Sequence, residues 1–391
     1  DASIDYVAGG FIFDPITNRN HHADLPILAI TQEYGAIPRD EIDYKVSVTK
    51  KSLKAYKIVE KGDFIISLRS FQGGIEYSMY DGICSPAYII LRKKTNIIDQ
   101  YYKYYFKSHR FIQYLNKDLE GIRDGKMISY GQFSSILLPK PDEEEQQKIV
   151  DCLFSIDDLI SVEEKKLSLL NDYKKGWMQK LFPVEGKTVP EWRFPEFKDD
   201  NNWKCVEIET VGKVITGKTP PTSNDSLWNG SIQFVTPTDI VGDKYQRLVQ
   251  RTVVKTSNMK VLPKGTIMFT CIASVGKMAI SVYPCVTNQQ INSIITKKGY
   301  YNEFIYYSLF RNVNKIKSGL SNTTVPIINK TDFSKIQISV TLNEKEQQKI
   351  ANFLSGIDDL ISTQADRIEA LKQHKKALMQ GLFPAVEEVW K

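Results

Sequence analysis

The sequence contains few cysteines and histidines, and neither type is arranged as a metal site or a disulfide framework. The four histidines show no metal-ligand spacing. The five cysteines are odd in number and include no Cys-x-x-Cys pair: Cys84, Cys152, Cys205, Cys271 and Cys285. This pattern argues against a zinc ribbon or a disulfide scaffold and favours a reducing, cytoplasmic compartment. We therefore expect no metal site in this chain.

Long apolar runs and a phosphate-binding loop are also missing. Runs such as 87–91 are far too short to cross a bilayer. The stretch 274–278 contains a Gly-Lys pair, but the first Gly of a Walker A loop would fall at Cys271 and its Ser or Thr at Met278. No secretory signal is visible, and the chain starts at Asp1 without Met, so we expect that some N-terminal residues are absent.

One stretch occurs twice. EQQKI, IDDLIS and a closing LFP run from Glu145 to Pro183 and again from Glu346 to Pro384, at a constant offset of 201 residues. Apolar residues in both copies follow the alternating four-three spacing of a coiled-coil seam. Polar residues interrupt the seam at equivalent places, Glu163 and Gln364, then Lys174 and Lys375. The pattern predicts two helical rods, each about 60 Å long at about 1.5 Å per residue.

Each rod follows a globular module. Residues 1–141 contain short β-branched and aromatic runs that are typical of strands (25–31, 64–68 and 88–92), and 101–114 has helical spacing. Its tyrosines are better interpreted as a core face than as a stacking platform. Residues 202–341 echo the first module, because the run at 61–66 resembles that at 264–269 and both lead into small polar loops. The chain is thus a module and a rod, repeated.

This order predicts an α+β fold in which two mixed, β-rich modules are separated by two long antiparallel coiled-coil helices related by a pseudo-twofold axis. The predicted segments are 1–141, a first spacer helix at 142–183, a linker at 184–201, 202–341, and a second spacer helix and tail at 342–391. The second module must join the end of one rod to the start of the next, which favours antiparallel rods. We expect Trp192, Phe194 and Phe197 to fix the linker in place.

The positive charge lies in the modules. Residues 202–341 contain 17 Lys and Arg against 7 Asp and Glu, and residues 1–141 contain 19 against 16. The first rod is acidic, with 10 acidic and 6 basic residues in 142–183. A basic module implies an acidic partner, usually nucleic acid, and the alternative is a basic surface that only keeps the protein soluble, which applies more to the first module than to the second. Two basic modules on a stiff spacer would read two short DNA sequences separated by unread base pairs.

These motifs resemble a known family. EQQKI with IDDLIS and LFP, then PEWRFPEF, then Trp203 before TGKTPPTSN, WNG and FVTPTDI, are similar to the DNA specificity (S) subunit of type I restriction–modification systems, over nearly the whole chain. Module one departs from the pattern, because it lacks a counterpart of Trp203 and of the strand after it. The resemblance implies a non-catalytic subunit with two target-recognition domains that read a bipartite site in double-stranded DNA.

The resemblance also implies the partners. Two methyltransferase subunits that bind S-adenosylmethionine would dock on the chain and methylate adenine, and restriction subunits would add ATP-driven cleavage. No Asn-Pro-Pro-Tyr-type methylation motif or Gly-rich cofactor loop is present, so this chain itself should hold no cofactor. The remaining alternatives are a coiled-coil scaffold with two modules that do not bind DNA, and a fused methyltransferase, which the missing motifs nearly exclude.

The DNA contacts should come from loops with basic, amide or hydroxyl side chains, although turn chemistry or surface solvation could explain the same residues. The candidates are Arg69, Ser70, Gln72, Arg123 and Lys126 in module one and Lys218, Thr219, Arg251, Lys255, Ser274, Lys277, Asn322, Thr323 and Thr324 in module two. We favour Arg69 and Lys277, which lie in the matched loops.

The partner-docking candidates are the polar residues repeated in both rods. An acidic start explains Asp142–Glu145 through the helix dipole, but it does not explain identical acids further along. These candidates are Gln146, Gln147, Asp157, Asp158, Gln347, Gln348, Asp358 and Asp359.

Overall fold

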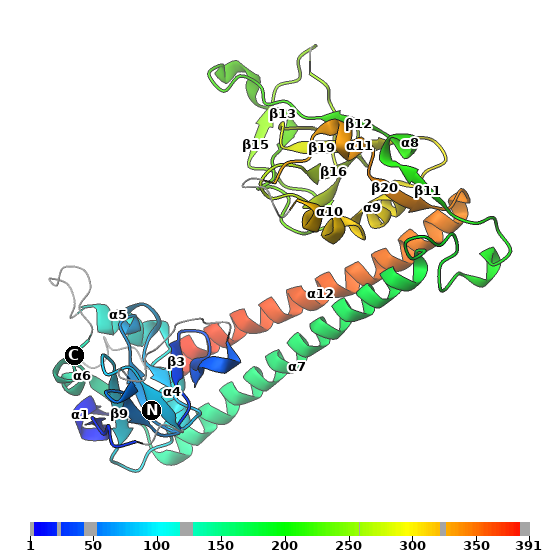
Figure 1. Ribbon diagram of the computed structural model, residues 1–391. Coiled ribbons are helices and arrows are strands. Elements are labelled where there is room, and N and C mark those ends of the chain that lie inside the picture. Colours follow the sequence, from blue (N-terminus) through cyan, green and yellow to red (C-terminus); the bar gives the residue numbers. More distant parts are fainter. Residues whose placement is uncertain are drawn as a thin grey trace. The chain divides into compact units, whose positions relative to one another are not determined.

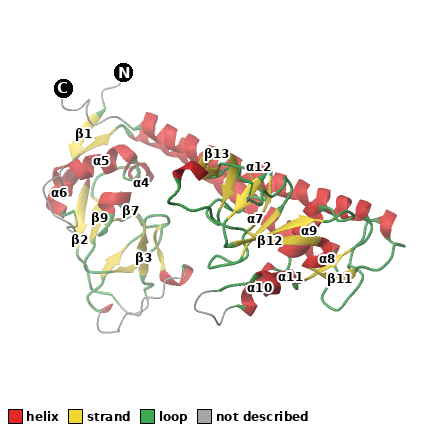
Figure 2. Ribbon diagram, turned by 90° about the horizontal axis from the view of Figure 1, so that it is seen from above, coloured by secondary structure: helices red, strands yellow, loops and turns green. Residues whose placement is uncertain are grey.

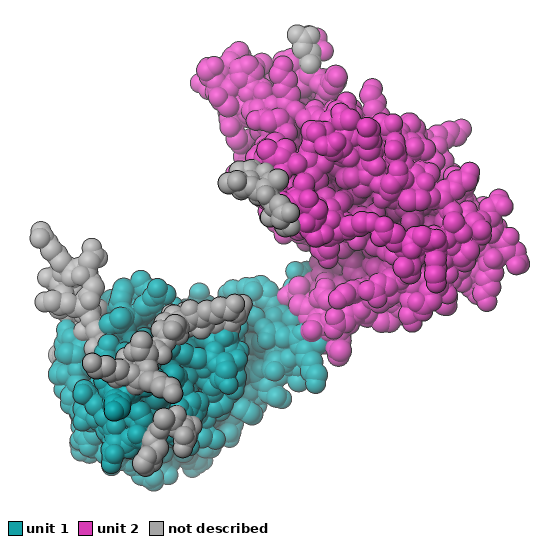
Figure 3. Space-filling model, in the orientation of Figure 1, with its two compact units in different colours: residues 1–165, 366–391 teal, residues 166–365 magenta. Residues whose placement is uncertain are grey.

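The computed structural model describes residues 4–21, 25–42, 53–117, 128–257, 259–320 and 326–383. The chain forms two compact units, residues 1–165 with 366–391 and residues 166–365 (Figure 3). The candidates Arg123, Lys126, Asn322, Thr323 and Thr324 lie outside the described residues. Each unit contains one module together with part of both long helices, so the unit boundaries fall within the helices.

Two helices of 39 residues, α7 (Glu143–Leu181) and α12 (Glu344–Leu382), confirm the predicted rods (Figure 1). Both begin with side-chain caps, because Asp142 Oδ1 accepts a hydrogen bond from the Glu145 amide at 2.8 Å and Asn343 Oδ1 accepts one from the Lys345 amide at 3.0 Å. Such caps satisfy amides that have no partner within the helix. Each helix ends two residues before a proline, which cannot continue it.

The two helices are antiparallel in each unit. In the first unit Lys375 pairs with Asp157 at 2.5 Å and Arg367 pairs with Glu163 at 2.8 Å, so residue numbers rise along one helix as they fall along the other. In the second unit Lys174 pairs with Asp358 at 2.5 Å. The seam interruptions Glu163, Lys174 and Lys375 therefore have partners across the helix pair, which explains how polar seam residues fix its register.

The first unit contains module one. Its central sheet has the strand order β2-β9-β6-β7, with helices α4, α5 and α6 gathered beside these strands (Figure 2). The elements are β1 (Asp5–Ala8), α1 (Gly9–Ile12), β2 (Phe13–Ile16), β3 (Leu28–Thr31), β4 (Gly35–Pro38), η1 (Arg39–Glu41), β5 (Lys57–Val59), β6 (Phe64–Ile66), α3 (Ser70–Gly73), β7 (Glu76–Tyr77), β8 (Gly82–Cys84), β9 (Ile89–Lys93), α4 (Asp99–Tyr105), α5 (His109–Lys117), α6 (Tyr130–Ser135) and β10 (Leu137–Lys140).

The tyrosine-rich segment forms α4 and α5 and supplies the core of module one. Tyr101, Tyr102 and Tyr105 are almost fully buried, and the Tyr102 hydroxyl donates to the Pro139 carbonyl at 2.9 Å. Phe13 and Phe64 pack edge to face at 5.3 Å in the same cluster. The interpretation of these tyrosines as a core face is therefore confirmed.

The second unit contains the linker and module two, whose central sheet has the order β12-β19-β16-β17-β14. The elements are η2 (Pro195–Phe197), β11 (Lys204–Glu207), α8 (Ile208–Val211), β12 (Gly212–Thr216), η3 (Asp225–Leu227), β13 (Trp228–Val235), β14 (Tyr245–Gln246), β15 (Arg251–Val253), β16 (Ile267–Thr270), β17 (Met278–Ser281), β18 (Cys285–Thr287), β19 (Ile291–Thr296), α9 (Asn302–Phe310), α10 (Val313–Gly319), α11 (Lys330–Ser334) and β20 (Gln337–Val340).

The two modules repeat one topology. The sheet β2-β9-β6-β7 matches β12-β19-β16-β17, and β1 pairs antiparallel with β10 as β11 pairs with β20. The prediction that module one lacks the strand after Trp203 is therefore wrong. β1 is that strand, and Ile4 precedes it where Trp203 precedes β11. The sequence hid the equivalence because the strand is only four residues long and shares no motif with β11.

The linker is held by aromatic packing and by one buried ion pair. Trp192 packs on Trp177 at 5.1 Å and Phe194 on Phe353 at 6.1 Å, as expected for a fixed segment. The Arg193 guanidinium binds both carboxylate oxygens of Glu346, at 2.7 and 2.8 Å, and both side chains are buried. Hydrogen bonding to Glu346 raises the pKa of Arg193. This pair joins the linker to the start of α12.

Replacing Glu346 with Ala should destabilise the chain by about 3–5 kcal/mol, because a buried guanidinium would lose its carboxylate. The measurement is chemical denaturation followed by circular dichroism. The matched control is Glu196→Ala, which removes an exposed carboxylate that pairs with Lys349 at 3.0 Å. We expect no measurable change for this surface pair. Equal effects of the two substitutions would contradict the role of the buried pair.

Alkaline solution should unfold module one as its buried tyrosines ionise. Burial raises the pKa of Tyr77 to about 12 and raises the pKa values of Tyr101 and Tyr102 as well. The pKa of a tyrosine in the unfolded chain is near 10. A tyrosine with a raised pKa in the folded state therefore contributes its full stability below pH 10, and this contribution is lost as the pH rises toward 12. Stability of Tyr77→Phe should therefore fall less over this window than that of the parent chain. Tyr283→Phe, at an exposed ring, should behave like the parent.

Candidate nucleic-acid interface

The matched loops both join two neighbouring antiparallel strands, β6 to β7 and β16 to β17. In module one Arg69 and Gln72 are exposed, whereas Ser70 is buried and its Oγ accepts from the Ser67 amide at 2.9 Å. The Arg69 carbonyl accepts from Gln32 Nε2 at 3.2 Å. Ser70 therefore fixes the loop, while the side chains of Arg69 and Gln72 are free to reach a ligand.

In module two Lys277 is exposed, with its Nζ 3.5 Å from the Pro237 carbonyl. Ser274 is half-buried, and its carbonyl accepts from Thr270 Oγ1 at 2.5 Å. Gly276 has a φ of 92°, a conformation that glycine adopts without strain. The loop is thus built on a tight turn that holds Lys277 at the surface.

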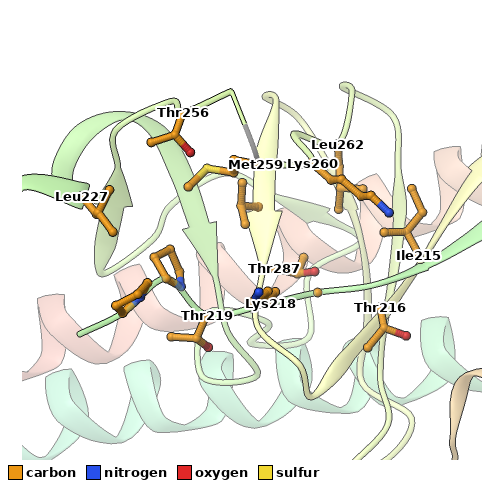
Figure 4. Close-up of a pocket in the computed structure, with 14 residues that line it drawn as sticks. Ile215, Thr216, Lys218, Thr219, Leu227, Thr256, Met259, Lys260, Leu262 and Thr287 are labelled. Atoms are coloured by element: carbon orange, nitrogen blue, oxygen red, sulfur yellow. The ribbon is translucent and has the colours of Figure 1, made fainter. Parts of the chain in front are cut away.

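A cavity of about 410 Å³ lies beside the loop that follows β12 (Figure 4). Lys218 and Thr219 line it, together with Lys260 and the apolar side chains of Met259 and Leu262. Thr219 Oγ1 donates to Gln289 Oε1 at 2.7 Å, so this loop is anchored to the turn before β19. Lys260 was not among the predicted residues, because only folding brings it to Lys218.

Arg251 is exposed, and its guanidinium carbon lies 3.6 Å from the centre of the Trp228 ring. Trp228 Nε1 donates to the Pro221 carbonyl at 3.2 Å, and Pro221 lines the same cavity. Lys255 is exposed and close in sequence to Thr256, which also lines it. The structure therefore gathers Lys218, Thr219, Arg251 and Lys255 around one region, while Ser274 and Lys277 belong to a separate loop.

The first aspartate of IDDLIS takes part in a contact that fastens module one to the helix pair. Asp157 on α7 accepts from the Tyr104 hydroxyl of α4 at 2.8 Å and from Lys375 Nζ of α12 at 2.5 Å. Lys375 also lies over the Tyr104 ring, 5.2 Å from its centre. We call Tyr104, Asp157 and Lys375 the first triad.

The second triad repeats this arrangement with the two helices exchanged. Asp358 on α12 accepts from the Tyr307 hydroxyl of α9 at 2.5 Å and pairs with Lys174 of α7 at 2.5 Å. Burial and the Asp358 charge raise the pKa of Tyr307. Lys244 donates to Ser355 at 2.5 Å beside this triad, and burial lowers the pKa of Lys244. Both repeated aspartates therefore connect a module to the two helices.

Of the two repeated glutamines in each helix, one is buried and one is exposed. Gln146 and Gln347 are buried and accept from the Ile98 and Tyr301 amides at 3.0 and 2.7 Å, just before α4 and α9. Gln147, Asp158, Gln348 and Asp359 are exposed. Contacts within the chain thus explain why Gln146, Gln347, Asp157 and Asp358 are identical in the two copies. The four exposed residues remain as a surface that a partner could contact.

The closing LFP motif has a role that the sequence analysis missed. Phe383 is fully buried in the core of module one, 5.5 Å from the ring centres of Tyr101 and Tyr105. Phe182 is buried in module two and stacks on Phe304 at 5.5 Å. The sequence signal for this role was that the phenylalanine recurs at the same offset as the proline. A motif that only ended a helix would need the proline but not the phenylalanine.

Among the described residues, none of the helices contains a stretch long and apolar enough to span a membrane. The same residues contain no group of three or more His, Cys, Asp or Glu side chains placed to hold a metal ion.

A family model described as the type I restriction modification DNA specificity domain matches residues 12–172 and 200–373. The chain belongs to this family. Each match includes one module and much of the long helix that follows it. The DNA specificity domain therefore occurs twice, in the places where the internal repeat was found.

Two curated relatives of this DNA specificity protein come from Methanocaldococcus jannaschii. It is 32% identical over 213 residues to the type I restriction enzyme MjaIX specificity subunit, covering 52% of this chain and about half (49%) of that relative. It is 27% identical to the putative MjaX specificity subunit, covering 88% of this chain and 82% of the relative. The predicted family is confirmed by the match of the DNA specificity domain, and both relatives are named as specificity subunits.

Solved structures confirm the fold. A chain from a study of complex assembly and conformational transition in the type I R-M system superposes with a TM-score of 0.64 at 17% identity, covering 98% of both chains. The type I restriction-modification S subunit from M. genitalium gives 0.58 at 13% identity and covers 98% and 97%. The predicted α+β fold with two modules and two long antiparallel helices is therefore correct.

Adjacent aspartates in this specificity protein should separate a structural role from a surface role. Asp358→Asn removes the charge that Lys174 and Tyr307 share and should lower stability by about 1.5–3 kcal/mol, the range for hydrogen bonds to charged groups. Asp359→Asn changes an exposed neighbour and should leave stability unchanged. Thermal unfolding of both variants measures the difference. Equal stability of the two would mean that the second triad contributes nothing to the fold.

Proposed function

We propose that this chain is the cytoplasmic specificity subunit of a type I restriction–modification complex and that it reads a bipartite site in double-stranded DNA. Each module reads one half-site. The observation that carries this proposal is the duplication of the DNA specificity domain, each copy with its own sheet and its own matched loop. The loops differ in sequence, so the two half-sites differ as well.

The charge and the loop chemistry support DNA as the ligand. Module two has 17 basic and 7 acidic residues, and its exposed Lys218, Arg251 and Lys277 are suited to phosphates and base edges. Module one contributes the exposed Arg69 and Gln72. Of the candidates outside the described residues, Arg123, Lys126, Asn322, Thr323 and Thr324 stay predictions.

The partners we propose are two methyltransferase subunits and the restriction subunits. The exposed Gln147 and Asp158 on α7 recur as Gln348 and Asp359 on α12, so equivalent surfaces would meet equivalent subunits. Gln146, Gln347, Asp157 and Asp358 would support docking indirectly, by fastening each module to its helices. S-adenosylmethionine and ATP would bind to the partner subunits.

The test uses the chain purified with its methyltransferase partner. Its mass should correspond to two methyltransferase subunits, and sequencing of methylated adenines should reveal a two-part target. Inserting one or two base pairs between the half-sites should abolish tight binding, because helices α7 and α12 are continuous over 39 residues and cannot stretch. Binding that is indifferent to the spacing would refute the proposal.

A matched pair of lysines controls for general charge loss in the same binding assay. Lys277→Ala removes an exposed cation from the matched loop and should weaken binding at every sequence. Lys198→Ala removes an exposed cation from the linker and should bind as the parent does.

A further inference from the structure

Module one contains a cavity of about 780 Å³ that no part of the sequence analysis anticipated. It lies between the β3–β4 hairpin and the loop at residues 67–69. Leu28, Ala29 and Tyr88 form an apolar part of the lining, and Arg39 and Arg69 supply two cations. The size falls within the range of pockets that hold ligands.

Arg39 occupies a rigid position beside this cavity. It follows β4 as the first residue of η1, and its backbone amide donates to the Ile27 carbonyl at 2.9 Å. The hairpin before it is closed by Thr31, whose Oγ1 donates to the Gly35 carbonyl at 3.1 Å and accepts from the Tyr34 amide at 3.0 Å. Its backbone is therefore preorganised before any ligand arrives.

The guanidinium of Arg39 is unusual because two of its three nitrogens are unsatisfied. Nε and Nη1 are buried and have no hydrogen-bond partner among the residues that the structure describes. By contrast, Arg92 in the same module binds both oxygens of Asp63 at 2.8 Å, and Arg193 in the second unit binds Glu346. An arginine stays charged, and burying its donors without acceptors costs free energy. A site of this kind is completed by a ligand that brings acceptors, once the long side chain turns toward the cavity.

The lining favours a neutral acceptor over an anion. Glu33 and Glu76 line the cavity together with the two arginines. Lys107 pairs with one oxygen of Glu76 at 2.6 Å, while the other oxygen is buried and has no partner in the described part of the chain. A phosphate placed here would be repelled by these carboxylates, whereas the edge of a guanine offers two uncharged acceptors, O6 and N7, that match an arginine fork.

We infer that Arg39 is a specificity-determining residue of module one and that it reads a guanine edge in the half-site bound there. This inference rests on the proposed function. Arg69 lies on the loop at the other side of the cavity, with its backbone held by Gln32 and by the Ser67 hydroxyl, and approaches the same stretch of DNA. The apolar part of the lining, Leu28, Ala29 and Tyr88, would contact groups in the major groove that form no hydrogen bonds, such as a thymine methyl.

The experiment measures binding of the chain, assembled with its methyltransferase subunits, to duplexes carrying the mapped target. Each base pair of the target is replaced in turn. Arg39→Ala should lose about 10- to 100-fold in affinity for the parent target and should lose discrimination at one G·C pair of one half-site. Discrimination throughout the other half-site should stay intact, which shows that the variant is folded.

Lys94→Ala is the matched control, because Lys94 is an exposed cation of module one that pairs with Asp14 at 2.8 Å, away from the cavity. It should retain discrimination at every position. Two results would overturn the inference: binding and specificity unchanged in Arg39→Ala, or a uniform loss at all sequences with the salt slope reduced by about one, the behaviour of a phosphate contact. Absence of any two-part target for the parent complex would instead refute the proposed function.

Discussion

The constraint on which the rest of the structure depends is that neither module is complete without the end of a long helix that comes from the other half of the repeat. Phe383, at the end of α12, fills the core of module one, and Phe182, at the end of α7, fills that of module two. Each core therefore requires α7 and α12 to be antiparallel. A parallel pair would carry each closing phenylalanine to the wrong end of the helices and leave two aromatic cores open.

Polar contacts fix the register of α7 against α12, which apolar packing alone leaves undetermined. A coiled-coil seam of isoleucine and leucine tolerates sliding by whole heptads, but the triads Tyr104–Asp157–Lys375 and Tyr307–Asp358–Lys174 allow only one register. Each triad also includes a tyrosine from the module, so the register of the helices and the seating of the module are set together. These ion pairs are half-buried, with the side chains of Lys174 and Asp358 19% and 17% exposed.

The repeat separates scaffold from readout. The order of four strands in the main sheet, the capped starts of α7 and α12, the buried glutamines and the triads are shared by both units, whereas the matched loops differ. Module one has Arg69 and the cavity with Arg39, and module two has Lys277 and the cavity with Lys218 and Arg251. A family of DNA specificity subunits can vary the exposed positions of such loops, while buried loop residues such as Val275 belong to the core.

The sequence by itself determined the repeat, the two long helices and their antiparallel order, because periodicity and a constant offset of 201 residues are local signals that survive without coordinates. It also identified the linker aromatics and the tyrosine core. Only the tertiary structure decided what the repeated polar residues do. Asp157 and Asp158 are neighbours with the same chemistry, yet one is committed to Tyr104 and Lys375 and the other is exposed, since that difference depends on residues 53 and 218 positions away. The tertiary structure was also needed to recognise β1, because that strand is only four residues long. It was needed for Arg39 too, because the unsatisfied donors of its guanidinium are evident only in the folded chain.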